Sequence, residues 1–158
     1  MGERYLKSIR LLAECMQDFE RFSSDFVRQY GLTHAQFDII ATLGNTAGMS
    51  YKELGQKTLI TKGTLTGVVE RLEQKGLVIR ERCPRDKRSY YVRLSTQGEQ
   101  VFQDVFPKLT RQGQRLFANY TDDDFNHLET TLAGLKQAIA SGPSSNTDSD
   151  SNKTKETS

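Results

Sequence analysis

The sequence predicts a mainly α-helical protein with one small β-hairpin, an α+β fold of the winged helix-turn-helix class. Near the middle of the chain, Ser50 and Thr61 are polar residues of the kind that precedes a helix, and a tight turn separates the two predicted helices. Gly76 ends the second helix, and two strands are predicted after it, at residues 77–82 and 90–94. Two helices joined by a tight turn and followed by a hairpin can place one helix in the DNA major groove.

Residues 3–30 predict one long helix. Apolar residues recur there at intervals of three and four, the spacing of one helix face. They form two adjacent stripes, the first Leu12, Cys15, Phe19, Phe22 and Phe26, the second Leu6, Ile9, Ala13 and Met16. Two stripes on one helix need two packing surfaces, and this chain's own core and a partner chain would supply them. Gly31 ends the helix, because glycine adopts the left-handed cap conformation at little cost.

Two capping boxes mark the next two helix starts. Thr33 is followed three residues later by Gln36, and Ser50 by Glu53. In each pair both side chains can satisfy backbone N–H groups that a helix start leaves unpaired. The second of these helices is expected to be short, over about residues 51–57.

The helix predicted over about residues 62–75 is the candidate DNA-reading helix. Its buried face is expected to consist of Leu65, Val69 and Leu72. A helix that enters the major groove needs small or hydrogen-bonding residues at its N-terminal end. Two glycines here cost up to about 1 kcal/mol each in helix propensity, which makes sense if another molecule comes close. The candidate DNA-binding residues of this helix are Thr61, Lys62, Gly63, Thr64, Thr66, Gly67 and Arg71.

The tip of the predicted hairpin, CPRDKRS, carries the second group of candidate DNA-binding residues. These are Arg85, Lys87 and Arg88, on a loop too polar to pack. An arginine on such a wing can enter the narrow minor groove, where the potential is most negative. We expect Asp86 to pair with or orient Arg88 rather than meet DNA. The alternative is a simply solvated hairpin tip, which the position one strand after a helix-turn-helix disfavours.

Two further helices are predicted after the hairpin. Ser95 begins the first, which runs toward Tyr120 with Pro107 inside it. An interior proline removes one backbone hydrogen bond at a cost of about 3 kcal/mol, so a kink or a break is expected there. Thr121 and three aspartates start the last helix, with acidic residues at its positive dipole end. Its apolar residues repeat with the spacing of a coiled-coil seam: Phe125, Leu128, Leu132, Leu135 and Ile139.

The composition favours one domain with a nucleic-acid site. The chain has 158 residues and a net charge of only +2, but residues 33–98 hold eleven Lys or Arg and six Asp or Glu. Such a basic centre on a nearly neutral chain is typical of a nucleic-acid site. We see no signal peptide and no apolar run of membrane-spanning length, and two cysteines are too few for a disulfide framework. A cytoplasmic protein with no membrane partner is therefore expected.

Two segments also carry a family resemblance. TKGTLTGVVERLEQKGLV and RDKRSYYVRLSTQG resemble the MarR family of bacterial transcription regulators, whose wing pattern is Asp-x-Arg, a strand and Leu-Thr/Ser-x-x-Gly. The matching residues are Asp86, Arg88, Leu94, Ser95 and Gly98. The resemblance covers residues 5–140. One departure is Gly67, where many relatives have Arg, so a base contact made there in relatives is missing.

The resemblance implies an obligate homodimer that binds a pseudopalindromic operator in double-stranded DNA, controlled by a small ligand or by oxidation. The dimer would be held by the terminal helices, about 3–30 and 99–140, around a DNA-binding part at about 33–98. Residues 1–140 then form the regulator, and 141–158, which have no apolar residue able to pack, form a disordered tail. The candidate dimerisation residues are Leu6, Ile9, Leu128, Leu132, Leu135 and Ile139.

The two cysteines leave alternatives open. Some relatives sense organic hydroperoxides through a reactive cysteine in the first helix, and Cys15 lies there. However, Cys15 sits on an apolar stripe and closer to the next helix start than the sensing cysteine typically does, which favours a small core residue. Cys83 enters the wing beside basic residues, where an ordinary exposed thiol is expected. A metal or iron–sulfur site would need ligands from a second subunit.

Other function classes fit less well. The sequence has no nucleophile–base pair, metal-ligand spacing or phosphate loop, so neither an enzyme nor a cofactor is expected. His34 and His127 are predicted to be surface or capping residues. Aromatic residues near the first helix are expected to be core rather than an effector pocket. A non-specific architectural DNA protein would need a much larger basic excess than +2.

Overall fold

The computed structural model describes residues 3–86 and 88–142. The chain divides into two units, Met1–Leu116 and Phe117–Ser158. The elements of the first unit are α1 (Arg4–Val27), a 3-10 turn η1 (Arg28–Tyr30), α2 (His34–Leu43), β1 (Met49–Ser50), α3 (Tyr51–Thr58), α4 (Lys62–Gln74), β2 (Val78–Arg82), β3 (Tyr90–Leu94) and α5 (Thr96–Leu116). The second unit contains α6 (Asp122–Ala140). This is the mainly α fold with a small hairpin that the sequence predicts.

Local signals determine where these helices start and stop. Both predicted capping boxes are formed: Gln36 N–H donates to Thr33 Oγ1 at 3.2 Å, and Glu53 N–H donates to Ser50 Oγ at 3.2 Å. Gly31 follows the first helix in the left-handed conformation, with a φ of 71°. Unpaired backbone groups at helix ends are thus satisfied by residues next to them in sequence.

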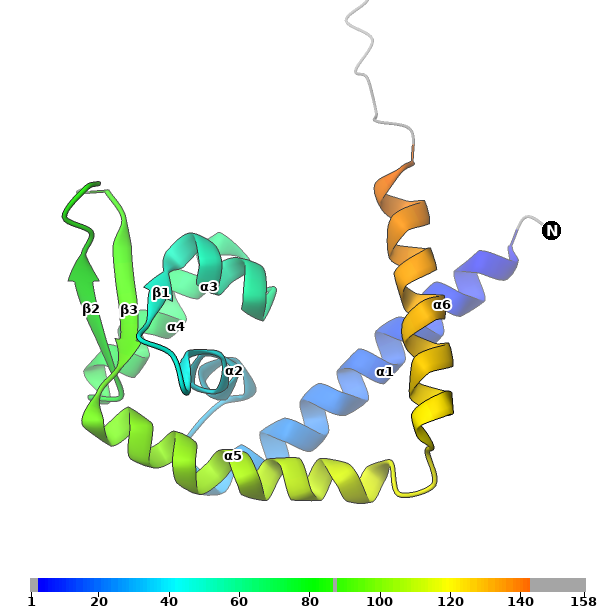
Figure 1. The fold of residues 1–158 in the computed structure, drawn as a ribbon, viewed down its shortest axis with the longest axis horizontal. Helices are drawn as coiled ribbons and strands as arrows, with labels where there is room; N and C mark the ends of the chain where they lie inside the picture. Colours follow the sequence, from blue (N-terminus) through cyan, green and yellow to red (C-terminus); the bar gives the residue numbers. More distant parts are fainter. Residues whose placement is uncertain (1–2, 87, 143–158) are drawn as a thin grey trace, which may run out of the picture. The chain divides into compact units, whose positions relative to one another are not determined.

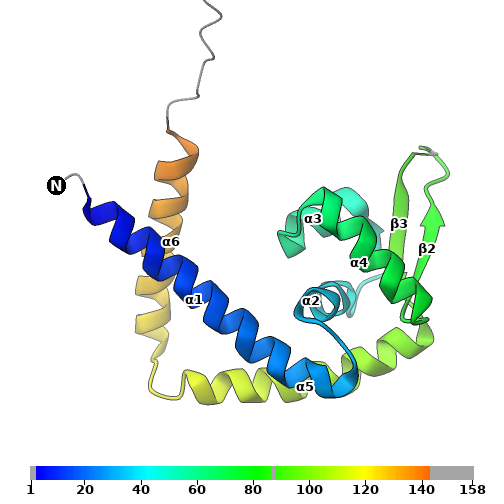
Figure 2. The same cartoon turned by 180° about the vertical axis from the view of Figure 1, so that it is seen from behind.

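The sheet has three antiparallel strands in the order β1-β3-β2. In Figure 1, β2 and β3 lie side by side as a hairpin, and the short β1 lies along β3. Residue pairs Val78–Leu94 and Arg82–Tyr90 fix the hairpin register. The sequence did not indicate β1, which pairs Met49 with Val92. Figure 2 shows α4 alongside the hairpin, which it contacts through β2.

One hydrophobic core holds α2, α3, α4, the sheet and the start of α5 together. The predicted inner face of α4 is confirmed, since Leu65, Val69 and Leu72 are buried, and Val68 is buried with them. The other buried apolar residues come from every neighbouring element: Val27, Leu32, Phe37, Ile39, Ile40, Leu43, Met49, Leu54, Val78, Val92, Leu94, Phe102 and Val105.

The junction between the hairpin and α5 explains the second half of the family's wing pattern. Ser95 donates from its hydroxyl to the Gly76 carbonyl and accepts the Gly98 N–H at 3.0 Å. A Cβ on Gly98 would lie 2.0 Å from the Leu77 carbonyl oxygen, a distance that no side chain tolerates. Ser95 and Gly98 therefore serve the fold, because they let the end of α4, the base of the hairpin and α5 meet closely.

Helix α5 continues through Pro107, so the predicted possibility of a break is wrong. Phe102 and Val105 are buried on one side of the helix, whereas Pro107 and Gln103 are exposed. The carbonyl that loses its partner is that of Gln103, four residues earlier, which water can reach. Packing on the inner side then holds the helix together.

The second unit is one helix with an aromatic cluster at its start. Thr121 and Asp124 form a capping box, in which Asp124 N–H donates to Thr121 Oγ1 at 3.2 Å. Phe117, Tyr120 and Phe125 lie with ring centroids 5.4–5.7 Å apart. None of the residues of α6 is buried.

Candidate nucleic-acid interface

The N-terminal end of α4 is exposed and built from small and hydrogen-bonding residues. Lys62, Gly63 and Thr64 are exposed, while Thr66 and Gly67 are half-buried. A Cβ on Gly63 or Gly67 would meet nothing within 4 Å, so packing inside the chain does not require either glycine. Their lack of a side chain leaves the helix backbone open to another molecule.

Thr61 occupies the position before α4 but does not cap it in the predicted way. Its hydroxyl donates to Thr64 Oγ1 at 3.1 Å and accepts no backbone N–H. The first N–H groups of the helix are therefore left without a side-chain acceptor, at the end where the helix dipole is positive. Such an end binds anions, including the phosphates of a nucleic acid.

The hairpin tip presents Arg85 and Arg88 as exposed side chains. Asp86 shapes the turn: its carboxylate accepts the Arg88 N–H at 3.0 Å, and its carbonyl accepts the Ser89 N–H at 3.0 Å. Asp86 therefore orients Arg88 through the backbone, as expected in outline. Lys87 lies outside the described residues.

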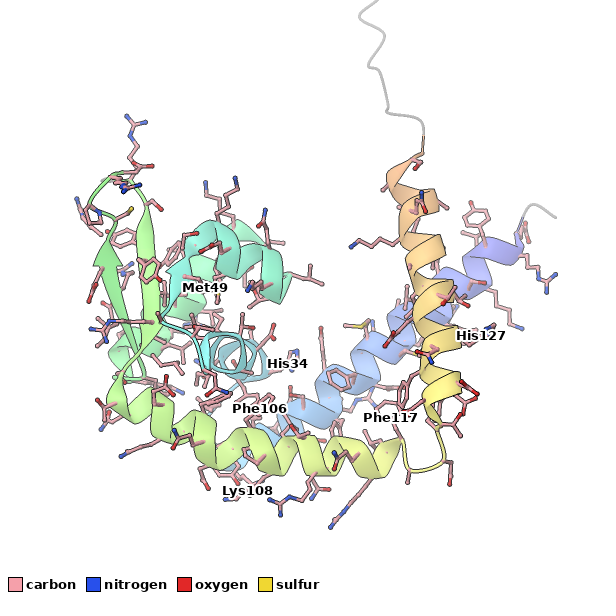
Figure 3. All side chains as sticks on the ribbon, viewed as in Figure 1. His34, Met49, Phe106, Lys108, Phe117 and His127 are labelled. Carbon is pink, nitrogen blue, oxygen red and sulfur yellow. The ribbon has the colours of Figure 1, made fainter. Side chains whose placement is uncertain are left out.

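A hollow of about 560 Å³ separates the helices from the wing. Three basic residues, Lys52 of α3, Lys62 of α4 and Arg88 of the wing, line it together with the rings of Tyr51 and Tyr90. Figure 3 shows nitrogen-tipped side chains that project from the α3–α4 region and from the hairpin tip toward the same side. Sequence reasoning missed Lys52, Tyr51 and Tyr90, because only the fold brings them beside the candidate residues.

The carboxylates of this region are already engaged, and most of its cations are not. Glu53 caps α3, while Glu70 and Glu73 pair with Arg80, and Glu81 pairs with Arg93. Among the described residues, the following basic side chains have no ion pair: Lys52, Lys57, Lys62, Arg71, Arg82, Arg85 and Arg88. The surface that carries them has a local positive charge that attracts phosphate.

Comparison with known proteins agrees with this geometry. The family model described as "MarR family" matches residues 30–89. The HTH-type transcriptional regulator MhqR of Bacillus subtilis is 28% identical over 107 residues, which cover 68% of this chain and 74% of MhqR. The central part of the chain, residues 30–89, belongs to the MarR family. The chain is a DNA-binding regulator of transcription, and the relatives that it matches are transcriptional regulators.

Two solved structures show that the MarR fold extends over nearly the whole chain. AbsC, a MarR family regulator from Streptomyces coelicolor, has a TM-score of 0.77 at 21% identity and covers 90% of this chain and 98% of its own. The MepR–DNA complex from S. aureus has a TM-score of 0.73 at 16% identity and covers 82% of this chain and 96% of its own.

The candidate dimerisation residues of this MarR chain lie on exposed helix surfaces. Leu6 is 53% and Ile9 38% exposed on α1. On α6, Leu128 and Leu132 are 43% and 37% exposed, and Ile139 is 63% exposed, while Leu135 is half-buried. Each unit by itself leaves these side chains uncovered.

The prediction for Cys15 was wrong: Cys15 is exposed on α1, not part of the core of the chain. His34, predicted to be a surface or capping residue, is half-buried. Its ring lies edge-on against Phe19 with centroids 6.5 Å apart, and its Nδ1 is shielded from solvent. Nearby, burial raises the pKa of the Asp38 carboxyl, and His34 partly opposes this.

The two remaining predictions about single residues have different outcomes. His127 is exposed on α6, as predicted, whereas Cys83, which was expected to be exposed, is half-buried directly after β2. Among residues 3–86 and 88–142, no helix is both long and apolar enough to cross a membrane. Of the predicted disordered tail, residues 141–158, the part from residue 143 onward lies outside the described residues.

Proposed function

We propose that this chain acts as a homodimer on a pseudopalindromic operator, with one reading helix and one wing on each half-site, and that a small ligand or oxidation controls it. The observation that carries the proposal is the exposed face on which Gly63 and Gly67 leave the α4 backbone open among unpaired cations. A glycine that serves no contact inside the chain, at a helix-propensity cost of up to about 1 kcal/mol, favours a close external partner.

The α4 residues are assigned to the major groove. Lys62 reaches a phosphate or a guanine edge, and Thr64 and Thr66 offer hydroxyls and methyl groups to base edges. Thr61 and the free N–H groups beside it suit a phosphate. Arg71, nearly three helical turns further along α4, suits the DNA backbone. Gly67 removes the arginine contact that many relatives make, so the preferred base sequence should differ from theirs.

The wing is assigned to the minor groove and its phosphates. Arg85, Lys87 and Arg88 are the candidate contacts, and the turn that Asp86 stabilises directs Arg88. MepR, a protein of the same fold, has been solved in complex with DNA, which supports a DNA-facing role for these elements.

The homodimer is inferred from apolar residues that one chain leaves exposed. Leu6 and Ile9 on α1 and the Leu128–Ile139 seam on α6 form regular apolar stripes rather than scattered residues. Residues 1–140 would then be the regulator, with the terminal helices as the dimer arms, and the cytoplasm would be its compartment.

Operator selection tests this proposal. Binding sites are selected from random DNA, and the affinity for the selected site is compared with that for scrambled DNA at several salt concentrations. We expect a preference of at least about 1,000-fold for the selected site, with two-fold related half-sites, and a steep loss of affinity with salt. Equal affinity for both DNAs, as an architectural protein would show, contradicts the proposal.

A second possibility concerns the signal. Because Cys15 is exposed on a helix assigned to the dimer interface, its oxidation would place a polar group among apolar contacts. A thiol-based peroxide sensor then predicts that peroxide releases DNA from the wild type and from Cys83→Ser, but not from Cys15→Ser. Release from Cys15→Ser as well would exclude Cys15 as the sensor.

A further inference from the structure

The inner face of the hairpin contains an arginine where the pattern calls for an apolar residue. Alternate residues of β2 face the same side, so Val78 shares a face with Arg80. Val78 pairs with Leu94, and Arg80 pairs with Val92, and all three apolar residues are buried. The Arg80 side chain is only 21% exposed. A guanidinium therefore stands in the row of side chains that packs against α4.

Arg80 joins β2 directly to α4 and β3, and through Tyr90 to α3. Its Nε lies 3.1 Å from Glu73 Oε2, and its Nη1 lies 3.5 Å from Glu70 Oε1, both on α4. Its Cζ lies 4.6 Å from the ring centroid of Tyr90, the first residue of β3. The Tyr90 ring in turn packs against Tyr51, the first residue of α3, with centroids 5.8 Å apart.

These contacts connect the two DNA-facing elements. Glu70 and Glu73 lie on α4, the helix whose N-terminal end carries the candidate base-contacting residues. Tyr90 follows Arg88 by two residues, at the base of the wing tip. Helix α4 and the base of the wing tip therefore both contact the Arg80 side chain.

Stability alone does not call for an arginine at this position. A largely buried ion pair contributes little compared with a well-packed apolar residue of similar size, because both charges lose water. A guanidinium does, however, fix direction: it is planar, binds carboxylates in defined geometry and stacks on aromatic rings. A methionine would fill the same space without imposing that geometry.

We infer that Arg80 is a positioning residue that fixes the wing relative to α4, so that Arg88 and the reading helix engage DNA together. This inference rests on the proposed function, because it gives the wing a share in operator binding. The guanidinium itself stays on the inner face of the hairpin, and its effect on DNA passes through Tyr90 to the wing tip.

A double-mutant cycle on the full-length protein separates positioning from simple stabilisation. Operator affinity is measured for wild type, Arg88→Ala, Arg80→Met and the double variant. We expect Arg88→Ala to lower affinity roughly tenfold in the wild type. In the Arg80→Met background the same change should lower affinity less than about twofold. A wing that is no longer held against α4 has already lost the Arg88 contact with DNA. Arg80→Lys should resemble Arg80→Met, because an ammonium cannot bridge two carboxylates and stack.

Arg93→Met provides the matched control. Arg93 belongs to the same hairpin and pairs with Glu81 at 3.2 Å, but on the opposite face, away from α4. In that background Arg88→Ala should still lower affinity roughly tenfold. If Arg80→Met does not fold, the cycle is repeated with Glu73→Gln, whose side chain is 42% exposed and whose loss removes the shorter ion pair.

The outcomes separate the two proposals. A tenfold effect of Arg88→Ala in both backgrounds would mean that Arg80 is merely structural and would overturn the inference while operator binding stands. No effect of Arg88→Ala in a wild type that still prefers its operator would also overturn it. Loss of operator preference in the wild type itself would instead refute the proposed function.

Discussion

Two regions of the molecule carry apolar residues at the same helical spacing. The reading part, α2 to β3, buries these residues, whereas the outer surfaces of α1 and α6 leave them exposed. Leu54 and Leu72 in the reading part are fully buried within one chain, whereas Leu6 and Ile139 on the helices are 53% and 63% exposed. In α1 only Ser23 and Val27, at the end next to the reading part, are buried. A sequence pattern thus indicates an apolar face but not whether the same chain covers it.

This difference is the basis for placing the proposed dimer contact on the helices rather than on the reading part. The reading part has a closed core and needs no partner to hold its shape, while α6 alone buries none of its residues. Regular exposed apolar stripes on two helices favour association with another copy. Substitutions on the helical surfaces should leave the core of the reading part intact, and substitutions in that core should leave the helical surfaces intact.

The largest effect is expected from charges on the α6 seam. Leu132→Glu with Leu135→Glu should convert the dimer to monomer at micromolar concentration, because buried unpaired carboxylates are costly. Operator affinity should fall at least about 100-fold, since one half-site contact remains. Sedimentation equilibrium measures the mass, and circular dichroism checks that the reading part stays folded.

The matched control for this pair lies on the same helix. Thr130→Glu with Gln137→Glu adds the same charge at exposed positions outside the seam and should leave the dimer intact. A dimer that survives the leucine changes would show that the interface lies elsewhere.

A smaller effect is expected from a cavity in the reading part. Leu72→Ala should lower the free energy of unfolding by about 2–5 kcal/mol, because the residue is fully buried against the sheet and neighbouring helices. Urea denaturation at fixed protein concentration gives the value. Leu128→Ala, on the exposed side of α6, should lower it mainly through dimerisation, so its effect should depend on protein concentration. A Leu72→Ala effect that depends equally on concentration would argue against a closed core.

The smallest effect is expected from the helix caps, which both regions use alike. Ser50→Ala removes the hydroxyl that caps α3 and should lower the free energy of unfolding by about 1 kcal/mol in thermal or urea melts. A change below the error of such melts would mean that the capping box contributes nothing to stability.

The stability contributed by the same capping box should depend on pH. The backbone N–H of Ser50, together with its hydroxyl, holds the pKa of Glu53 below its ordinary value of 4.5. A lowered folded-state pKa stabilises the protein above the unfolded-state pKa, and this is lost as pH falls through the folded value. The melting temperature should therefore drop between about pH 5 and 3, and less steeply in Glu53→Gln. Parallel pH curves for both proteins would contradict this cause.

The features predicted from the sequence are those that neighbouring residues decide. The capping boxes at Thr33 and Ser50, the glycine after α1 and the alternating strand β3 depend on contacts within a few residues. Strand β1 was not predicted, because it is only two residues long and is defined by the pairing of Met49 with Val92, which is distant in sequence.

The features that were missed or mistaken depend on the tertiary fold. In the sequence, Arg80 is one of several basic residues of a predicted strand, and its role depends on the packing of β2 against α4. Its alternation with Val78 on an apolar face could have indicated that it is partly buried. Cys15 shares its apolar stripe with half-buried and exposed residues, and His34 is placed against Phe19 only by the packing of α1 on α2. Hydrophobic periodicity predicts which face of a helix is apolar, whereas tertiary contacts determine which element packs on that face.

The most direct test of the central claim, that one chain provides half of a DNA-reading device, is the spacing of the two half-sites. The selected operator is compared with a version that carries five extra base pairs between its half-sites, which turns the second half-site by about half a helical turn. A dimer that holds two reading parts at a fixed distance should bind the lengthened operator at least about 100-fold more weakly, near its affinity for scrambled DNA. Unchanged affinity would show that a single chain reads the site alone or that the two copies are not held at a fixed spacing.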